Sequence, residues 1–480
     1  MKLRFTPLLN TCLALVLIVL FSCKKEQSVL ASGGKLLFSV DTLSFDTVFT
    51  QMGSFTTLVK IYNPQSSQVN ISNIRLQHGT ASFFHLNIDG ASGNTAANIK
   101  IAANDSIYVF ATVKVDPNSS LSPFLITDSL IATMNGSDFV LPMEAYGQNA
   151  NYVVGDTLDT QTWDPDLPYV IIHSAQVNPG QTLTIKPGCR IFMHADSRLI
   201  VSGTLIAKGT LTDSIIFQGD RLDRSYFGYE GYPGEWGGLY FDPHSSGSVL
   251  DYVLIENCGN SALNASPAAI ETVLDSVNNP LQPQLTLLHC VIQNSIGYGI
   301  LNFAGTIVAS NCLINTCGSW CFANLMGGTD SITNCTFVNY GTNKVDHSQY
   351  GTVALLNYVD TGSSYYEYKS GNLIASFRNC IIYGSLENEL YCNQKPGANA
   401  NISLQYCLAK TDSIPVFVYN SHCLLNTDPL FKDVSKWDYH YNAGSPAIDA
   451  GILVPLSDDL EGKPRPHGTA YDLGCYEYQN

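Results

Sequence analysis

A short phrase recurs between residues 285 and 408, and its spacing constrains the fold more than any other feature of the chain. Each copy places a cysteine, most often after an asparagine, in front of a run of strand-like residues. The copies lie at residues 289–294, 311–316, 334–339, 379–384 and 406–409. Their cysteines follow one another at intervals of 22, 23, 45 and 27 residues, so the long interval holds about two steps. A period in the low twenties is typical of a solenoid, in which each repeat buries its face only against its neighbours.

The pattern inside each copy indicates strands. Cys290, Ile292 and Asn294 alternate with Val291 and Gln293, and successive side chains of a strand face opposite sides. No copy contains the ten or more residues of helical periodicity that would indicate a helix. Stacked parallel strands place equivalent residues above one another, so we predict two buried ladders. One ladder is Cys290, Cys312, Cys335, Cys380 and Cys407, and the other, at the following turn, is Asn257, Asn294 and Asn339.

These ladders resemble those of the right-handed parallel β-helix found in pectin-lyase-like proteins. The resemblance covers residues 156–480. It implies an all-β chain in which a right-handed, single-stranded parallel β-helix occupies residues 169–480. Because this coil hosts lyases, hydrolases, adhesins and proteins without known chemistry, the resemblance does not select one activity.

The first 22 residues have the features of a targeting segment. Lys2 and Arg4 precede an apolar run at residues 12–21 that is too short to span a bilayer. The phrase ending in Cys23 resembles a bacterial lipobox, which implies a lipoprotein whose mature chain begins with a lipidated Cys23 and a tether at residues 23–34. We therefore expect a cell-envelope protein held on the outer membrane only by its lipid. The sequence leaves the periplasmic or cell-surface side and the oligomeric state open.

Residues 35–148 show a different pattern, with short strands and turn residues but no period in the twenties. Asn135-Gly136 between two apolar runs predicts a two-residue hairpin. The segment resembles the Ig-like domains of the abnormal-spindle type, which implies a β-sandwich that serves as a spacer or as a binding module. We expect residues 149–168 to be a linker.

Charge and cysteine content narrow the partners. A formal net charge of −16 excludes bulk electrostatic binding of nucleic acid. An acidic polysaccharide would need a bridging cation such as Ca²⁺ or a local basic cleft, and no other cofactor or metal site is predicted. Stacked ladder cysteines point in parallel, which disfavours disulfides among them. Cys317 and Cys321 lie off the ladder and are the better disulfide candidates.

Two insertions interrupt the period and become loops in a solenoid. Residues 221–236 carry four aromatic residues that are candidates for stacking on sugar rings: Tyr226, Tyr229, Tyr232 and Trp236. Residues 341–371 carry Asp346, His347, Tyr350, Tyr358, Tyr365, Tyr366 and Tyr368. The alternative is that these aromatic side chains only cover the flank of the coil.

The last part of the chain, residues 428–480, resembles the choice-of-anchor closing segment of exported bacterial β-helix proteins. Asp449, Asp459, Arg465 and Asp472 stand out in it. We expect Arg465 to pair with one of these carboxylates and to fix the loops, because arginine suits a bidentate grip. Metal binding and catalysis by this group are the alternatives.

Evidence for an enzyme is sparse in the sequence. Lyases on this coil use a basic residue beside Ca²⁺ held by acidic residues, and hydrolases need two carboxylates. The outward repeat positions show no stack of acidic residues, but Asp213 and Asp242 lie near Lys208 and Arg221. The catalytic candidates in this region are Asp220, Asp223 and Glu235. We expect a protein whose coil binds polysaccharide or another extended surface ligand; the alternatives are a polysaccharide lyase or glycoside hydrolase, and a structural or adhesive protein without a small ligand.

Overall fold

The computed structural model describes residues 29–30, 32–195, 197–222, 231–260, 266–273, 282–360 and 368–479. These residues form strands and two 3-10 helices, Gly79–Ala81 and Val434–Lys436, so the described chain is all-β as the sequence predicts. It divides into two compact units, residues 1–148 and 149–480. No helix in the described ranges is long and apolar enough to cross a membrane.

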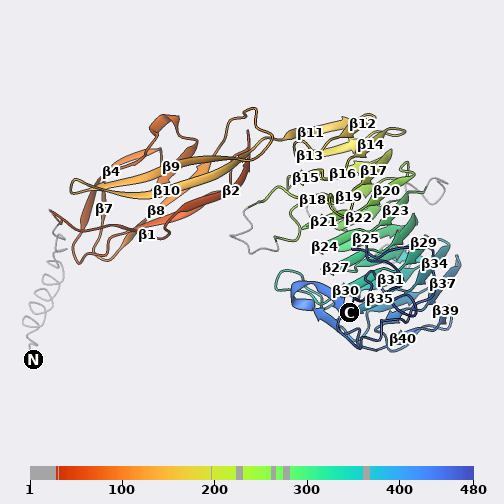
Figure 1. Cartoon of the computed structure of the whole chain (residues 1–480). Helices are drawn as coiled ribbons and strands as arrows, with labels where there is room; N and C mark the ends of the chain where they lie inside the picture. Colours follow the sequence, from red (N-terminus) through yellow and green to blue (C-terminus); the bar gives the residue numbers. More distant parts are fainter. Residues whose placement is uncertain are drawn as a thin grey trace, which may run out of the picture. The chain divides into compact units, whose positions relative to one another are not determined.

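The N-terminal unit is an Ig-like sandwich of two five-stranded sheets (Figure 1). The first sheet, in spatial order, contains β1 (Leu37–Phe38), β3 (Thr57–Tyr62), β8 (Ser106–Val113), β5 (Phe84–Ile88) and β6 (Ala91–Ser92). The second contains β2 (Leu43–Phe49), β10 (Ser137–Gln148), β9 (Phe124–Met134), β4 (Val69–Leu76) and β7 (Thr95–Ile101). All pairings are antiparallel except that of β2 with β10. Asn135-Gly136 joins β9 to β10 as the predicted hairpin turn.

The second unit is a right-handed parallel β-helix with three faces, whose strands stack in chain order (Figure 1). Face 1 consists of β12 (Gln161–Trp163), β14 (Thr182–Ile185), β17 (Thr204–Lys208), β20 (Ser248–Asp251), β23 (Gln284–Leu288), β26 (Thr306–Ser310), β29 (Gly328–Thr333), β34 (Leu373–Arg378), β37 (Ala400–Gln405) and β39 (Val418–Ser421). Face 2 consists of β15 (Arg190–Met193), β18 (Ile215–Gly219), β21 (Val253–Glu256), β24 (Val291–Ser295), β27 (Leu313–Cys317), β30 (Thr336–Asn339), β35 (Ile381–Gly384), β38 (Leu408–Ala409) and β40 (Leu424–Leu425). Face 3 consists of β16 (Leu199–Val201), β19 (Leu239–Phe241), β22 (Ala268–Thr272), β25 (Tyr298–Phe303), β28 (Phe322–Leu325), β31 (Val353–Leu356) and β36 (Leu390–Asn393).

The coil begins earlier than the sequence suggests. The expected linker at residues 149–168 instead contains β11 (Asn151–Leu158), which pairs with β13 (Tyr169–Val177), and β12, which pairs with β14. β13 continues into both face 2 and face 3. Because these strands hydrogen-bond to the next coil, residues 149–168 form its first turn and are not a linker.

The interior of the coil is filled by the inward side chains of all three faces. Phe322, Phe337 and Phe377 come from faces 3, 2 and 1, are fully buried, and have ring centroids 5.8–6.0 Å apart. Equivalent inward positions on successive coils repeat this packing. The core therefore runs through the coil as one cluster of apolar residues.

The predicted cysteine ladder is buried, and all twelve cysteines in the described part of the chain are free thiols. Each ladder thiol also donates to the carbonyl oxygen two residues earlier, at S···O distances from 3.1 Å for Cys380 to 3.4 Å for Cys407. Burial raises the pKa of Cys290, which keeps its thiol protonated as a donor. Cys317 and Cys321 are free as well, so the expectation of a disulfide between them is not met.

The asparagine ladder is shorter than predicted. Asn294 Nδ2 donates to Asn257 Oδ1 at 2.6 Å, and both side chains are buried. On the later coils, Asn339 Nδ2 donates instead to the carbonyl oxygen of Cys317 at 2.6 Å. Asn257 and Asn294 have φ values of +60° and +56°, a left-handed conformation that asparagine tolerates better than most residues.

The closing segment lies on the outside of face 2 and not beyond the last coil. It contains the hairpin of β41 (Phe431–Asp433) and β42 (Asp438–Tyr441). Its buried residues, among them Tyr439 and Leu473, pack on the outward side chains of face 2, such as Leu313 and Ile381. The apolar outward positions of the repeats are therefore a second packed layer.

Candidate functional site

The first insertion contributes little to a binding surface in the described residues. Tyr226, Tyr229 and Asp223 lie outside them. Tyr232 is 46 % exposed, and Lys344 Nζ lies 4.9 Å from its ring centroid. Trp236 is fully buried, and its indole nitrogen donates to the carbonyl oxygen of Glu256 at 2.9 Å. The prediction that Trp236 offers its ring to a ligand is therefore wrong, because the ring is part of the coil core.

Three of the acidic residues near the first insertion lie at different corners of the coil. Asp213 lies between faces 1 and 2, Asp220 between faces 2 and 3, and Asp242 between faces 3 and 1. Asp220 Oδ2 lies 2.6 Å from His194 Nδ1 in the turn of the preceding coil. Glu235 Oε1 accepts from the amide of Tyr232 at 2.9 Å. The three-sided coil therefore separates Asp213, Asp220 and Asp242, which are close in sequence, whereas the side chain of Glu235 lies against Gly219, next to Asp220.

A cluster of aromatic rings on the outside of face 3 is the strongest candidate for a binding site. Trp320 lies in the turn before β28, Tyr350 lies before β31, and Tyr391 lies in β36. The centroid of Trp320 is 6.1 Å from that of Tyr391, with an interplanar angle of 25°, and 6.0 Å from that of Tyr350. Tyr350 and Tyr391 are 43 % and 44 % exposed. Three successive coils thus each contribute one ring to the surface.

A glycine allows this arrangement. Gly351 lies on the coil between those of Trp320 and Tyr391, and a Cβ atom at this position would lie 3.0 Å from Trp320 Cζ3 and 2.9 Å from the carbonyl oxygen of Asn388. Both contacts are closer than a side chain tolerates without movement of its neighbours. The missing side chain lets the indole ring lie directly on the backbone of the next coil.

Polar groups border the aromatic cluster. Asn393 Nδ2 donates to the hydroxyl oxygens of Tyr391 at 2.9 Å and Tyr358 at 3.2 Å. Lys395 Nζ lies 4.3 Å from the ring centroid of Tyr358 and pairs with Asp360. Burial and the neighbouring Tyr391 raise the pKa of Tyr358 to about 12, so its hydroxyl stays neutral near pH 7. The rim therefore offers an amide, hydroxyls and a cation beside the exposed rings.

A buried polar triad holds the segments that carry two of the rings. His347 Nε2 lies 3.2 and 3.1 Å from the two carboxylate oxygens of Glu389, and Thr352 Oγ1 donates to Glu389 Oε2 at 2.6 Å. The side chains of His347 and Glu389 are 1 % and 0 % exposed. His347 Nδ1 has no hydrogen-bond partner among the described residues, which favours a proton on Nε2. The triad ties the Tyr350 loop to the strand of Tyr391.

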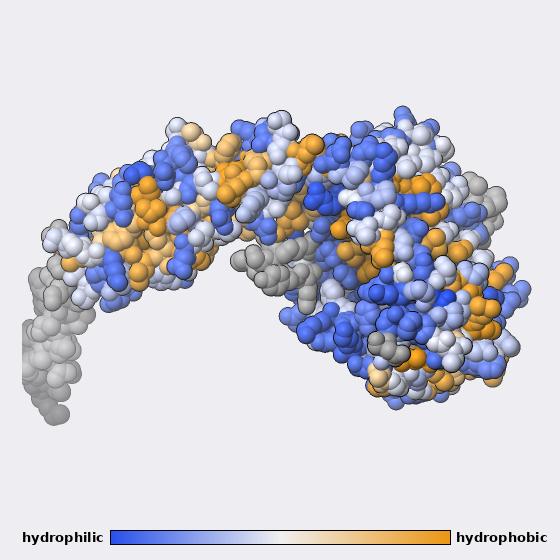
Figure 2. All heavy atoms as spheres, in the orientation of Figure 1, coloured by the Kyte–Doolittle hydropathy of each residue, from blue (hydrophilic) through white to orange (hydrophobic). Residues whose placement is uncertain are grey.

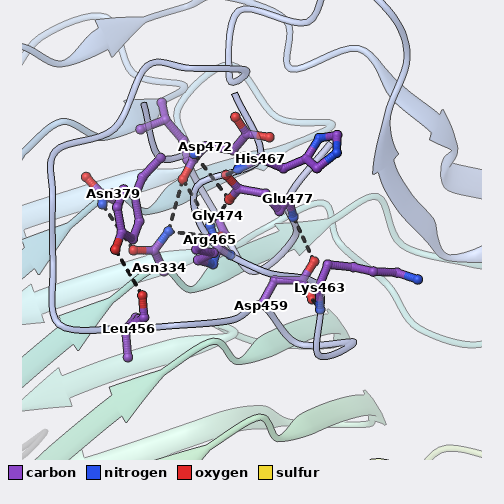
Figure 3. Close-up of polar contacts among 12 residues, drawn as sticks. Asn334, Asn379, Leu456, Asp459, Lys463, Arg465, His467, Asp472, Gly474 and Glu477 are labelled. Carbon is purple, nitrogen blue, oxygen red and sulfur yellow. Dashed lines mark hydrogen bonds and ion pairs between the residues drawn. The ribbon is translucent and has the colours of Figure 1, made fainter. Parts of the chain in front are cut away.

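The charged residues of the closing segment form a second polar network, drawn in Figure 3. Arg465 Nη1 pairs with Glu477 Oε2 at 2.7 Å, and the two side chains are 0 % and 1 % exposed. The guanidinium also donates to the carbonyl oxygens of Asp458, Asp472 and Gly474. Burial raises the pKa of Glu477, while Arg465 opposes this rise. The partner of Arg465 is thus Glu477 and none of the three expected aspartates.

Those aspartates hold loop backbone instead. Asp449 Oδ1 accepts from the amides of Thr469 and Ala470, and Asp472 accepts from the amides of Asp449 and Tyr478. The remaining carboxylate, Asp459, accepts from the amides of Glu461, Lys463 and Glu477. These bonds occupy the carboxylates, and no group of three or more potential metal ligands occurs among the described residues. The network supports the structural interpretation of this segment.

The closing segment is attached to the coil through three asparagines at the corner between faces 1 and 2. Asn311 Nδ2 donates to the carbonyl oxygen of Asp458, and Asn334 Nδ2 to that of Asp472. Asn379 exchanges two hydrogen bonds with the backbone of Ile452 (2.8 and 2.9 Å) and donates a third to Asn334 (Figure 3). The asparagine that precedes the ladder cysteine thus has a docking role that the repeat pattern does not reveal.

Sequence reasoning located only part of the aromatic cluster. It named Tyr350 and Tyr358 in the second insertion, whereas Tyr365 and Tyr366 lie outside the described residues. It missed Trp320 and Tyr391, which lie in the regular turns and strands. Their common signal is an aromatic residue at an outward position of face 3 on neighbouring coils, and this signal requires the register of the coils.

Comparisons with known proteins add little. No family model matches the chain, and no curated protein matches it. Among solved structures, a family 123 glycoside hydrolase from Clostridium perfringens, described for glycolipid glycan hydrolysis, is similar at 10 % sequence identity with a TM-score of 0.18. The similarity covers 25 % of this chain and about a quarter (26 %) of that one. A likeness this weak carries no argument about fold or function.

Proposed function

We propose that the protein is a polysaccharide-binding protein of the cell envelope, and that the ligand lies along face 3 of the coil. The observation that carries this proposal is the set of neighbouring rings of Trp320, Tyr350 and Tyr391, of which the two tyrosines are exposed and Trp320 is partly buried. Aromatic faces are apolar and match the C–H faces of sugar rings, while the polar rim serves the sugar hydroxyls. Because the rings come from successive coils, an extended chain fits them better than a compact ligand.

The proposal also includes the location of the protein and the family to which its coil is related. The lipobox-like phrase supports a lipid on Cys23, and the ladders and closing segment support kinship with pectin-lyase-like proteins of the choice-of-anchor type. The abnormal-spindle-like sandwich then lies between the anchor and the coil in the sequence. The net charge of −16 favours a neutral polysaccharide over an acidic one unless Ca²⁺ bridges the two.

A glycan array tests the proposal. The full chain is applied with and without Ca²⁺, and every bound glycan is then incubated with the protein and examined for shortened or unsaturated products. Binding without products is the expected result. Products from any bound glycan would contradict a binding role and favour the lyase or hydrolase alternative, and no binding across the array would favour a structural or adhesive protein.

A further inference from the structure

The outer surface of the first sandwich sheet exposes apolar and aromatic side chains. Strand alternation directs every second residue of β3 and β8 away from the core. Leu58 and Tyr62 on β3 are 41 % and 37 % exposed, and Tyr108 and Phe110 on β8 are 43 % and 40 % exposed. Figure 2 shows hydrophobic side chains among hydrophilic ones on the surface of the N-terminal unit. A spacer role alone does not explain four exposed apolar and aromatic side chains on two paired strands.

The two rings on β8, called the platform below, have nearly parallel planes. The centroids of Tyr108 and Phe110 are 6.5 Å apart, and their planes differ by 17°. Phe110 is opposite Leu58, and Tyr108 is opposite Lys60, whose Nζ lies 5.1 Å from the Tyr108 centroid. Nearly parallel, exposed rings on a sheet offer an apolar surface for a flat partner.

A hollow of about 330 Å³ adjoins the platform at Phe110. Its polar lining consists of the side chains of Thr56, His85, Asn87, Ser92 and Thr112. Asn87 Oδ1 is buried and has no hydrogen-bond partner among the described residues. A buried acceptor without a partner costs free energy unless a ligand or water donates to it. The hollow thus combines an aromatic wall with several hydrogen-bonding groups.

We propose that this surface is a second carbohydrate site, and that it takes a neutral sugar chain. The rings of Tyr108 and Phe110 stack on sugar faces, while the polar lining of the hollow binds hydroxyl groups. The residues lining the hollow include no carboxylate or permanent cation, so a neutral ligand fits it better than a charged one. All residues of this site belong to the sandwich, so the proposal can be tested independently of the function proposed for the coil.

Sedimentation of the full chain with insoluble cellulose, chitin and starch granules tests this site. The Trp320→Ala/Tyr391→Ala variant removes the coil cluster, so any residual binding reports on the sandwich. Adding Tyr108→Ala/Phe110→Ala to that variant should weaken the residual binding about tenfold or more. Tyr146→Ala, on the other sheet at 43 % exposure, is the matched control and should change nothing. Because these side chains are exposed, the variants should fold, and circular dichroism checks this.

Each outcome is decisive for the sandwich. If the coil variant still binds and the added platform substitutions remove this binding, the sandwich site is supported. If the platform substitutions alone abolish binding of an otherwise unchanged chain, the sandwich site is supported and the coil site is contradicted. Residual binding that survives the platform substitutions overturns it. The absence of residual binding after the coil substitutions also overturns it, leaving the coil as the sole carrier.

Discussion

At the scale of single residues, Asp330 has an unusual environment. It is fully buried inside the coil, where Asn302 Nδ2 and Asn324 Nδ2 donate to its two carboxylate oxygens at 2.9 and 2.6 Å. Burial raises the pKa of Asp330 to about 7, although the two amides oppose this rise. The unfolded chain releases this proton near pH 4, whereas the folded protein keeps it until about pH 7. Each pH step inside this window therefore favours the unfolded state.

The coil should therefore lose stability between pH 4 and pH 7 on account of this one residue. A shift from 3.8 to about 7 corresponds to about 4 kcal/mol at most, and nothing further is lost above the window. Asp330→Asn removes the titration, and Asn324 Oδ1, which has no partner among the described residues, can accept from the new amide after rotation. Scanning calorimetry at pH 5 and pH 8 should show a smaller loss of melting temperature in Asp330→Asn than in the wild type. Equal losses would contradict the assigned pKa.

At the scale of elements, the buried triad fixes the second insertion against the strand of Tyr391. Glu389→Ala leaves the Nε2–H group of His347 and the hydroxyl of Thr352 buried without an acceptor, and each such loss costs about 1–3 kcal/mol. The matched variant Glu389→Gln keeps an acceptor for His347 and for Thr352, and should lose less stability. We expect sugar affinity to fall in Glu389→Ala at temperatures where the coil is still folded, because the Tyr350 loop is released. Unchanged affinity in the folded variant would show that the triad does not position the rings.

The attachment of the closing segment can be tested at Asn379. Its side chain makes three hydrogen bonds, and its φ of +52° is easily adopted by glycine. Asn379→Gly therefore removes the bonds without backbone strain, and we expect a loss of about 1–3 kcal/mol. Hydrogen exchange should accelerate in the closing segment more than in the sandwich. Equal exchange rates for the closing segment in Asn379→Gly and in the wild type would contradict the docking role of Asn379.

The same elements show what sequence reasoning could reach. The period of Cys290 and its repeats predicted the coil, its parallel strands and the buried thiols, because each repeat obeys the alternation of a strand. The aromatic cluster on face 3 was harder to predict, because it depends on which residues of successive coils share a face. Trp236 and Trp320 both lie within two residues of a glycine, yet Trp236 is fully buried and Trp320 is only partly buried. The corner positions of Asp213, Asp220 and Asp242 depend on the same register.

At the scale of the whole molecule, the sandwich and the coil lie in one chain, and we propose that a lipid tether precedes them. If the lipobox-like phrase is processed as proposed, the mature protein is held only by lipid at its first residue. Cys23→Ser should then move the protein from the detergent phase to the aqueous phase in a Triton X-114 partition of cells. Because Cys23 precedes the first strand of the sandwich and the whole of the coil, sugar binding should be unchanged. A variant that stays in the detergent phase would contradict the lipid anchor.

Two aromatic surfaces on one tethered chain would bind a polysaccharide together more tightly than either alone, provided that both reach the same ligand. We propose on this basis that the molecule holds a glycan at the cell envelope.

The most direct test of this account is the affinity of the full chain for its best array glycan, measured by calorimetric titration for the wild type and two variants. Trp320→Ala removes the central ring of the coil cluster and should weaken binding by about 2 kcal/mol, or roughly 30-fold. Tyr419→Ala removes an aromatic side chain that is 60 % exposed on face 1 and should leave the affinity unchanged. Equal affinities for the wild type and Trp320→Ala would contradict the proposal that the aromatic cluster on face 3 binds the glycan.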